Sequence, residues 1–441
     1  MVEPLKVGLA GLGTVGVAVM RLIESRRDAL RASCGRPVEV VAVSARSRRK
    51  DRGVPLDGVR WIDDPVALAC DPEIDVFVEL IGGAEDPAKA AVEAALQAGK
   101  SVVTANKALL ARHGVALAAL AEAADVSLSF EAAVAGGIPI VKTLREGLVG
   151  NAVTRVYGIL NGTCNYILSR MEAEQLSFEA CLKEAQRLGY AEADPSFDID
   201  GHDTAQKLAI LAGLAFGIAP DQDAISVEGI STIAPQDLKA ADELGYRVKL
   251  LGVAVRTDQG IEQRVHPTMV PKTSAVAQVM GVINAVTIDA DAVHEITLMG
   301  PGAGGMATAS AVMSDLGDFA RGAWQLPFGR PAAQLAKAEK LPMQRHEGGY
   351  YIRLMAVDRP GTAATIARRL AEENISLESI VQRRSGLIPH GGDDPGTSAE
   401  PVPVILITYA TSEDAVRRAL SAVETDGVIA GKPQVIRIEK A

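Results

Sequence analysis

The sequence predicts an α/β fold in three parts: a doubly wound parallel sheet, an α+β domain and a small ferredoxin-like domain. Three observations predict it. Short apolar runs alternate with helical stretches over the first 130 residues, a glycine-rich turn follows the first of these runs, and the last 90 or so residues have the order βαββαβ. Strands that are apolar throughout and joined by helices are typical of a parallel sheet covered on both faces.

The first domain is expected over residues 1–136. Its strands are predicted at 7–10, 38–43, 76–80, 101–104 and 127–130, and its helices at 15–31, 87–98 and 107–124. Residues 300–321 open with four glycines and continue as a helix of small residues. Such a helix can pack closely on the first domain, so we assign residues 300–321 to it.

The middle of the chain, residues 137–299, mixes helices with longer strands. Helices are predicted at 139–148, 164–175, 178–188 and 201–215, and strands at 246–257 and 261–270. This mixture indicates an α+β domain. We expect it to bind substrate and to form the dimer interface.

The C-terminal part follows a stretch, residues 322–347, that is rich in proline, lysine, glutamine and arginine and indicates a linker. Within residues 348–441, strands are predicted at 350–357, 377–383, 404–409 and 435–439, helices at 362–373 and 412–423, a turn at 358–361 and a loop at 385–403. This is the order of a ferredoxin-like domain.

Composition excludes several classes of function. The 441 residues are 48% hydrophobic and carry a net charge of −10, which argues against nucleic acid as a partner, because phosphate binding needs clustered lysine and arginine. No run reaches the ~20 apolar residues of a membrane span, and no basic leader precedes the first strand. Four cysteines without CxxC or CxxH spacing, Cys34, Cys70, Cys164 and Cys181, make a reducing cytoplasm the expected location.

A glycine turn directly follows the first strand and opens the first helix. In Gly11-Leu12-Gly13-Thr14-Val15-Gly16, the first glycine allows the tight turn, the second lets the backbone approach a pyrophosphate, and the third lets the helix pack on the strand. The helix N-terminus then offers free N–H groups to the phosphates. In this context the turn predicts a Rossmann-like dinucleotide site rather than a purely structural bend.

The end of the second strand bears on which nicotinamide cofactor binds. NAD-preferring folds place an acid there to bond the ribose 2′-hydroxyl. Here Arg46, Arg48 and Arg49 precede the first acid, Asp51, and arginines can hold a 2′-phosphate by charge-assisted hydrogen bonds. The sequence therefore favours NADP, with NAD as the alternative; the basic run could also be only a solvated loop.

Two further segments place lysines where chemistry is expected. Lys107 follows a strand's C-terminal end, where ligands bind in open α/β sheets, although it could be a surface residue. Lys207 lies four residues after Asp203, so the two share one helix face, with Glu192 and Asp198 shortly before them. Acids beside a lysine suit a substrate with an ammonium group and a reacting oxygen. The alternative is an acid-rich helix N-terminus that favours the helix dipole.

The segment Asn161-Gly162-Thr163-Cys164-Asn165 reads as a turn that enters a helix. Its asparagine and threonine offer donors and acceptors, or merely cap the helix. Cys164 could be a nucleophile, but no histidine lies nearby in sequence to activate it. Acyl transfer through Cys164, as in other semialdehyde dehydrogenases, is thus one rival function, and a nucleotide-binding sensor without turnover is another.

These segments together resemble the homoserine dehydrogenase family. The matching pieces, in the family's order, are GLAGLGTVG (8–16), TANKALL (104–110), FEAAVAGGIPI (130–140), ILNGTCNYIL (159–168), LGYAEADPSFDIDGHDTAQKLAIL (188–211) and GPGAGGMATASAVMSDL (300–316). The tail that begins YYIRLMAVDRPGTAATIARRL resembles an ACT domain. No aspartokinase-like segment precedes the glycine turn, which is typical of the monofunctional form.

The resemblance implies reversible oxidation of L-homoserine to L-aspartate 4-semialdehyde, in threonine, methionine and isoleucine biosynthesis. By matching motif, Lys207 takes the acid/base role and Lys107 lies beside substrate and cofactor. The implied substrate-binding residues are Gly189, Glu192, Asp198 and Asp203, and the cofactor contacts are Gly11, Gly13, Thr14, Val15, Gly16, Arg46, Gly83, Lys107 and Gly304.

The resemblance also implies a monovalent cation, usually sodium, in FEAAVAGGIPI. Its ligands correspond to Glu131 and to the backbone carbonyls of Val134, Gly136 and Ile138. Ligation by oxygen alone fits a hard cation.

The ACT-like tail suggests regulation. Its turn, with Asp358 and Gly361, opens a helix whose N-terminal N–H groups can receive an amino acid's carboxylate. Threonine is the expected effector, as an end product of the pathway; alternatively the tail only holds the oligomer together. Because ACT domains usually pair side by side, a homodimer or homotetramer is expected.

Overall fold

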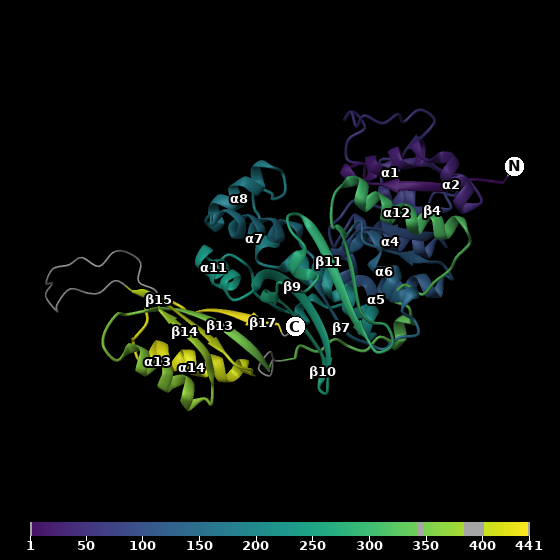
Figure 1. The fold of residues 1–441 in the computed structure, drawn as a ribbon. Coiled ribbons are helices and arrows are strands. Elements are labelled where there is room, and N and C mark those ends of the chain that lie inside the picture. The colour runs from purple at the N-terminus through teal and green to yellow at the C-terminus, as the bar shows by residue number, and fades with distance from the viewer. Residues whose placement is uncertain (1, 342–346, 383–400, 440–441) are drawn as a thin grey trace.

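The structure is a computed structural model that describes residues 2–341, 347–382 and 401–439. Its first domain, at the N-terminal end of the chain in Figure 1, is a parallel sheet of six strands. Their order is β3-β2-β1-β4-β5-β6. The strands are β1 (Leu5–Ala10), β2 (Val38–Ser44), β3 (Arg60–Trp61), β4 (Val76–Glu79), β5 (Ser101–Thr104) and β6 (Leu128–Ser129). The helices are α1 (Thr14–Ser25), α2 (Arg27–Cys34), α3 (Pro65–Ala69), α4 (Ala88–Gln97) and α5 (Lys107–Ala123). The doubly wound sheet predicted from the sequence is confirmed.

Alternate side chains of these strands enter two separate cores. Val78 and Val103 pack on one face with Val312 of α12 (Gly305–Ala320). Phe77 and Val102, their neighbours in sequence, belong to the core on the other face. Since successive residues of a strand point to opposite faces, apolar residues at every position bury both faces of the sheet. Helix α12 thus returns from far along the chain to cover the first domain.

The prediction of one helix over residues 15–31 is wrong. The helix ends at Arg26, whose φ of −120° and ψ of 17° are not helical, and α2 starts again in a new direction. The change of direction buries Cys34 against α12, where its Sγ lies 3.6 Å from the Cβ position of Gly317. The break therefore serves the packing of α12.

The middle domain is built on a larger sheet, which the sequence predicted only in part. Its strands are β7 (Val153–Ile159), β8 (Ser226–Val227), β9 (Tyr246–Thr257), β10 (Gly260–Pro271), β11 (Ile283–Ala290) and β12 (His294–Pro301). Its helices are α6 (Ile140–Lys142), α7 (Gly162–Glu174), α8 (Phe178–Arg187), α9 (Ser196–Ile199), α10 (His202–Phe216) and α11 (Pro235–Glu243). Strands β7, β8, β11 and β12 and helices α9 and α11 were missed; no residue of β12 is fully buried, so its apolar pattern is weak.

The C-terminal domain has the predicted ferredoxin-like order. Its strands are β13 (Glu347–Ala356), β14 (Leu377–Gln382), β15 (Val402–Thr408), β16 (Thr411–Ser412) and β17 (Gln434–Ile438), and its helices are α13 (Thr362–Glu372) and α14 (Glu413–Thr425). The four main strands lie in the order β17-β13-β15-β14, with both helices on one face (Figure 1). Most of the loop predicted at 385–403 lies outside the described residues.

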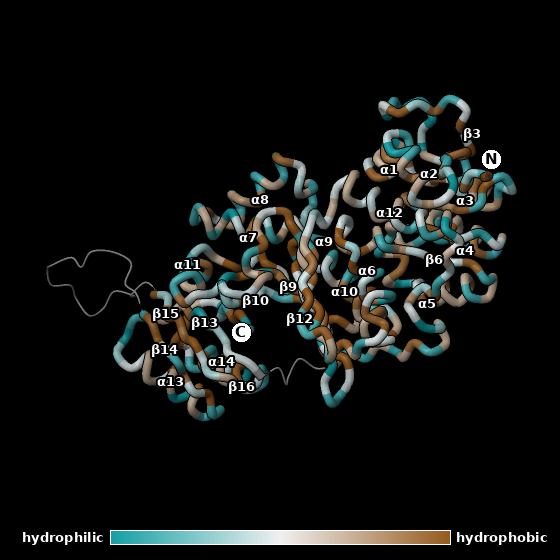
Figure 2. The backbone as a smooth tube through the Cα atoms, turned by 45° about the vertical axis from the view of Figure 1, so that its right-hand side comes forward, coloured by the Kyte–Doolittle hydropathy of each residue, from teal (hydrophilic) through white to brown (hydrophobic). Residues whose placement is uncertain are grey.

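One sheet runs through both the middle and the C-terminal domain. Strand β17 pairs in parallel with β10, Thr268 opposite Arg437 and Met269 opposite Ile438, so eleven strands form a single sheet. Figure 2 shows apolar stretches along β9 in the middle domain and along β15 in the C-terminal domain. The two domains therefore share backbone hydrogen bonds as well as side-chain contacts.

Ion pairs reinforce this junction. The guanidinium of Arg353 donates to both carboxylate oxygens of Asp237, at 2.6 and 3.1 Å, and the Tyr351 hydroxyl donates to the same carboxylate at 2.8 Å. The guanidinium of Arg437 donates to Glu228 of the middle domain and to Glu413 of α14. Removing one partner of a buried ion pair lowers the stability of the fold, because the other charge is left uncompensated.

The first part of the linker packs on the first domain. The buried ring of Phe328 lies 5.3 Å from that of Phe130, and the Ala332 N–H donates to Glu122 of α5 at 2.8 Å. Residues 342–346 of the linker lie outside the described residues. Within the described ranges, no helix has the length and apolar character needed to cross a bilayer.

Candidate active site

The glycine turn after β1 leaves no room for side chains at two of its three glycines. A Cβ on Gly11, whose φ is +101°, would lie 2.3 Å from the Leu80 carbonyl oxygen. A Cβ on Gly16 would lie 2.0 Å from the Gly11 carbonyl oxygen. Gly13 is different: it precedes α1, no side chain caps the helix, and nothing lies within 4 Å of its Cβ position. Open space before an uncapped helix N-terminus fits a pyrophosphate.

The basic loop after β2 is tied to this turn by an arginine that we had not singled out. Arg52 donates through Nε to the Leu12 carbonyl at 3.1 Å and through Nη2 to the Ser47 carbonyl at 2.6 Å. Its guanidinium also lies 5.6 Å from the centre of the Trp61 ring. The predicted cofactor contact Arg46 is exposed at the start of the same loop. Arg52 thus holds the loop that presents Arg46.

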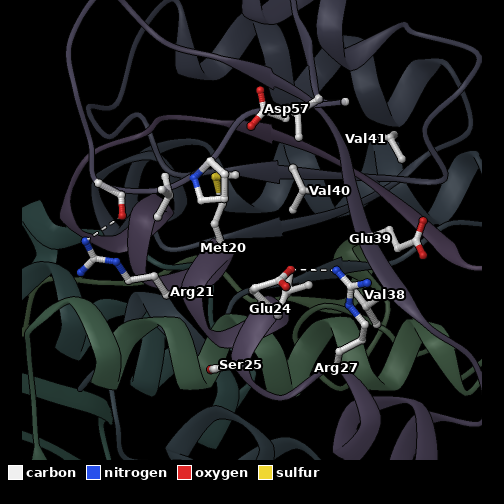
Figure 3. A pocket seen from close by; sticks show the side chains of 16 residues that line it. Met20, Arg21, Glu24, Ser25, Arg27, Val38, Glu39, Val40, Val41 and Asp57 are labelled. Carbon is white, nitrogen blue, oxygen red and sulfur yellow. Dashed lines mark hydrogen bonds and ion pairs between the residues drawn. The ribbon is translucent and has the colours of Figure 1, made fainter.

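A hollow of about 620 Å³ lies behind α1, between that helix, β2 and the loop at 53–59 (Figure 3). Arg21 donates to the Gly53 carbonyl there, and Glu24 pairs with Arg27 at 2.7 Å. None of the residues predicted to bind substrate or cofactor lines this hollow. We assign it no part in the chemistry.

A second cavity, of about 600 Å³, lies between the first and middle domains and collects residues from eight separate segments. The predicted site residues that line it are Val15, Lys107, Gly136, Gly189, Glu192, Asp198, Asp203, Lys207 and Gly304. Segments of the chain as far apart as α1 and the start of α12 therefore meet at one place. Gly11, Gly13, Thr14, Gly16, Arg46 and Gly83 lie outside its lining, as do Glu131, Val134 and Ile138.

Two lysines converge on one buried carboxylate in this cavity. Asp203 Oδ2 accepts from Lys207 Nζ at 2.7 Å, and Asp203 Oδ1 lies 3.3 Å from Lys107 Nζ. Burial by itself would raise the pKa of Asp203, but the ammonium groups of Lys207 and Lys107 outweigh it and lower that pKa to about 2. The carboxylate is therefore ionised throughout the physiological range. Lys207 Nζ also donates to the Leu160 carbonyl at 2.7 Å, which fixes its direction.

An asparagine joins this carboxylate to a second one. Asn161 Nδ2 donates to Asp198 Oδ1 and to Asp203 Oδ2, each at 2.8 Å, while its Oδ1 caps α7 by accepting from the Cys164 N–H. The two roles left open for Asn161, capping and side-chain donation, are both present. Burial and the charge of Asp203 raise the pKa of Asp198. A cationic group of the substrate beside Asp198 would therefore stabilise the ionised form of this carboxyl.

Cys164 is unsuited to nucleophilic attack. The side chain is fully buried, and its Sγ lies 3.2 Å from the Asp198 carbonyl oxygen, to which the thiol can donate. Burial, together with the charges of Asp198 and Asp203, raises the pKa of the thiol well above its usual range. The thiolate is the nucleophilic form of cysteine. This environment argues against the rival acyl-transfer reaction.

Lys107 is placed by hydrogen bonds that start at the end of β4. The buried carboxylate of Glu79 accepts from the Ile81 and Gly82 N–H groups at 2.7 and 2.9 Å, and from the Thr104 hydroxyl at 2.6 Å. Asn106 caps α5 and donates to the Gly83 carbonyl at 2.6 Å. Glu79 and Asn106 were missed; an acid at the end of an apolar strand was the available signal.

The segment assigned to a cation is compatible with one. Glu131 is buried, and its carboxylate accepts from the Val141 and Lys142 N–H groups at 2.9 and 2.8 Å. The turn that follows has φ values of +53° at Ala135 and +39° at Gly136. Within the described residues, the carbonyls of Val134 and Gly136 accept no backbone hydrogen bond, whereas that of Ile138 accepts one from the Ile140 N–H at 2.8 Å. Carbonyl oxygens free to coordinate, beside a buried carboxylate, suit a hard monovalent cation.

The predicted regulatory turn lies at the exposed start of α13. Gly361, with a φ of +95°, precedes the helix, and no side chain caps its first turn. The Thr362 hydroxyl donates to the Val357 carbonyl at 2.8 Å, and Asp358 is exposed. The arrangement leaves N–H groups of α13 available to a carboxylate.

The fold and the site together define a class of protein. A glycine turn for a dinucleotide, a lysine–carboxylate cluster facing it across one cavity, and an appended ferredoxin-like domain are the parts of an NAD(P)-dependent dehydrogenase with a regulatory-type domain. The comparisons with known proteins name the family.

The family model for homoserine dehydrogenase matches residues 139–316, and the model for the NAD-binding domain of homoserine dehydrogenase matches residues 11–131. The model for the ACT domain matches residues 350–424. The chain belongs to the homoserine dehydrogenase family, whose members are NAD(P)-dependent oxidoreductases that act on a CH–OH group. A homoserine dehydrogenase of Neisseria gonorrhoeae is 42% identical over 443 residues, and one of Pseudomonas aeruginosa 43% over 445, with 99% of each chain covered.

Solved structures agree with the assignment. A homoserine dehydrogenase from Thiobacillus denitrificans matches with a TM-score of 0.91 and 43% identity, covering 99% of both chains. A hyperthermophilic archaeal homoserine dehydrogenase in complex with NADPH matches with a TM-score of 0.62 and 26% identity, covering 74% of this chain and 100% of that one. The resemblance stated from the sequence is therefore confirmed.

Proposed function

We propose that the enzyme interconverts L-homoserine and L-aspartate 4-semialdehyde with NADP, and that Lys207 is the acid/base. The observation that carries this proposal is the meeting of Lys107, Asp203 and Lys207 in the cavity that also reaches Val15 and Gly304, at the starts of α1 and α12. A spectrophotometric assay with homoserine and NADP tests it: absorbance at the reduced-nicotinamide wavelength should rise, and a homoserine-free control should stay flat.

When bound, the nicotinamide supplies or receives the hydride. The chain's own task is to handle the proton at the substrate oxygen. In reduction of the aldehyde, the Lys207 ammonium donates that proton as the alkoxide forms; in oxidation, the neutral amine removes it. Asp203 and the Leu160 carbonyl hold Lys207 Nζ in place. Glu192 and Asp198 line the same cavity and would bind the substrate ammonium.

The exposed basic loop after β2 supports a preference for NADP over NAD. Replacing Arg46 with aspartate should weaken NADP far more than NAD, because the new carboxylate repels the 2′-phosphate and can accept from a 2′-hydroxyl. The measure is the ratio of kcat/KM for the two cofactors, which should fall by roughly tenfold or more, a loss expected for one charge-assisted hydrogen bond.

Arg31→Asp is the matched control, because Arg31 is an exposed arginine on α2 and the charge change is the same. Its cofactor ratio should equal that of the wild type. A wild-type enzyme equally efficient with both cofactors would contradict the preference. An unchanged ratio of kcat/KM in Arg46→Asp would instead indicate that Arg48 or Arg49 binds the 2′-phosphate.

Sodium bound by Glu131 and the carbonyls of Val134, Gly136 and Ile138 should order that turn. Replacing sodium chloride with choline chloride should then lower the Tm, and restoring sodium should recover it, since a ligand that binds only the folded state stabilises it. Glu131→Gln should abolish the sodium-dependent shift. Glu179→Gln, an exposed change on α8, should keep it. A Tm indifferent to sodium and potassium in the wild type would remove the cation from the proposal.

We further propose that the exposed start of α13, at Asp358 and Gly361, binds threonine, and that the enzyme works as a homodimer or homotetramer. The uncapped α13 N-terminus supports an amino-acid carboxylate there. The four free cysteines suit action in the cytoplasm.

A further inference from the structure

The active-site cavity contains an amide whose partners the protein does not supply. Asn284, near the start of β11, lines the cavity and is only 1% exposed. Its Oδ1 is buried and accepts no hydrogen bond within the part of the chain that the structure describes. A buried polar group without a partner is costly, so such groups are rare unless something else satisfies them.

The amide is held where it is by close packing. A Cβ on Gly302 would lie 1.9 Å from Asn284 Nδ2, so only glycine at 302 admits this side chain. A Cβ on Gly136 would in turn lie 2.7 Å from the Gly302 carbonyl oxygen. Asn284, Gly302 and Gly136 are thus closely packed, which restricts the movement of the amide.

This wall of the cavity leads to the dinucleotide turn. Gly305, three residues after Gly302, packs on α1, where its Cβ position lies 3.0 Å from the Thr14 carbonyl oxygen. The carboxylates of Asp198 and Asp203, which are proposed to bind the substrate, belong to α9 and α10 and offer a charged partner to the ammonium group of a ligand. Asn284 is thus linked through Gly302 to the segment that packs on α1, and its neutral amide offers no charge to the ionised groups of an amino-acid substrate.

We propose that Asn284 binds the carboxamide of the nicotinamide ring, with Oδ1 accepting from its NH2 group and Nδ2 donating to its carbonyl oxygen. A primary amide is the chemical complement of another, because each has one acceptor and two donors in a plane. The pair fixes the rotation of the ring, and hence the face from which hydride moves. The inference rests on the proposed cofactor function and adds to it the residue that orients the ring.

The test compares NADP with its 3-acetylpyridine analogue, in which a methyl group replaces the carboxamide NH2. Equilibrium binding by calorimetry keeps the analogue's different reduction potential out of the comparison. The wild type should bind NADP roughly tenfold more tightly than the analogue, as expected for one buried hydrogen bond. Asn284→Ala should bind both with nearly equal affinity, because it lacks the acceptor that distinguishes them.

Asn165→Ala is the matched control. Asn165 is also buried, but its amide donates to the Val279 and Ile283 carbonyls and accepts from Lys249. Asn165→Ala should lower the Tm of the cofactor-free enzyme and keep the wild-type preference. Asn284→Ala should leave that Tm close to the wild-type value, because no protein hydrogen bond is lost.

The inference is wrong if the wild type binds NADP and the analogue with equal affinity. It is also wrong if folded Asn284→Ala keeps the wild-type preference for NADP, or if Asn284→Ala lowers the Tm as much as Asn165→Ala does. Failure to bind either dinucleotide would instead refute the proposed cofactor function. Preference for NADP without turnover of homoserine would leave Asn284 in its role and refute the substrate.

Discussion

Replacing Lys207 with alanine is expected to lower kcat by about 10²–10⁴-fold, the usual cost of losing a positioned acid/base. NADP affinity should be unchanged, because Lys207 Nζ contacts Asp203 and the Leu160 carbonyl, away from the glycine turn. Stopped-flow reduction of aspartate semialdehyde measures the chemical step, and fluorescence quenching of NADPH measures binding. A variant that keeps more than about a tenth of the wild-type rate would show that another group moves the proton.

Lys207→Arg separates proton transfer from charge balance. The guanidinium would still neutralise Asp203, whose carboxylate is ionised with a pKa of about 2. Arginine does not give up a proton at ordinary pH, so Lys207→Arg should be as slow as Lys207→Ala if Lys207 is the acid. Recovery of activity in Lys207→Arg would mean that Lys207 only balances the buried carboxylate. Lys183→Ala, an exposed lysine on α8, should behave as wild type.

Threonine is expected to inhibit the enzyme at millimolar concentration, which corresponds to a modest site of about −4 kcal/mol. Coupling between two sites is typically worth 5–150-fold in affinity, so saturating threonine should raise the homoserine KM within that range. By reciprocity, homoserine should weaken threonine binding by the same factor by which threonine weakens the equilibrium binding of homoserine. Isothermal titration of threonine with and without homoserine measures both sides. An enzyme indifferent to threonine and to related amino acids would leave the C-terminal domain as an assembly module.

The junction between the two domains offers a way to break this coupling. Glu228 of the middle domain accepts from Arg437 at 2.8 and 2.9 Å and is itself 46% exposed. Glu228→Gln should weaken the inhibition by threonine while threonine binding and basal activity persist. Glu424→Gln, on the exposed side of α14, is the control. Full inhibition in Glu228→Gln would place the coupling elsewhere, such as in a subunit interface.

The sequence predicts the fold best where local pattern and long-range packing demand the same thing. The strand before Gly11 and the helix after Gly13 follow from an apolar run, a glycine turn and a helical period, and the structure contains both. Strand β12 had no such pattern. Its register is set by pairing with β11, and its exposed face carries mixed residues from His294 to Pro301. Pairing between segments is not visible in the composition of either.

The site divides in the same way. Asp203 and Lys207 are four residues apart on one helix, so spacing alone brought them together. Lys107 reaches Asp203 only because α5 and α10 meet in the fold, and spacing could not show that. Asn284 left one signal, a polar residue inside an otherwise apolar run. Its meaning depends on Gly302, which β12 brings beside it.

The pairing of β10 with β17 has a consequence for any shortened form of the enzyme. Thr268 and Met269 of β10 are fully buried where this strand pairs edge to edge with β17. A chain cut before β13 would present them on an open strand edge, a template on which other strands add and aggregate. Natural proteins protect such edges with a lysine, a proline or a bulge. Strand β10 already has Pro267 and Pro271, so a relative that dispensed with the C-terminal domain would need a further device, such as a lysine or a bulge, to stay in solution.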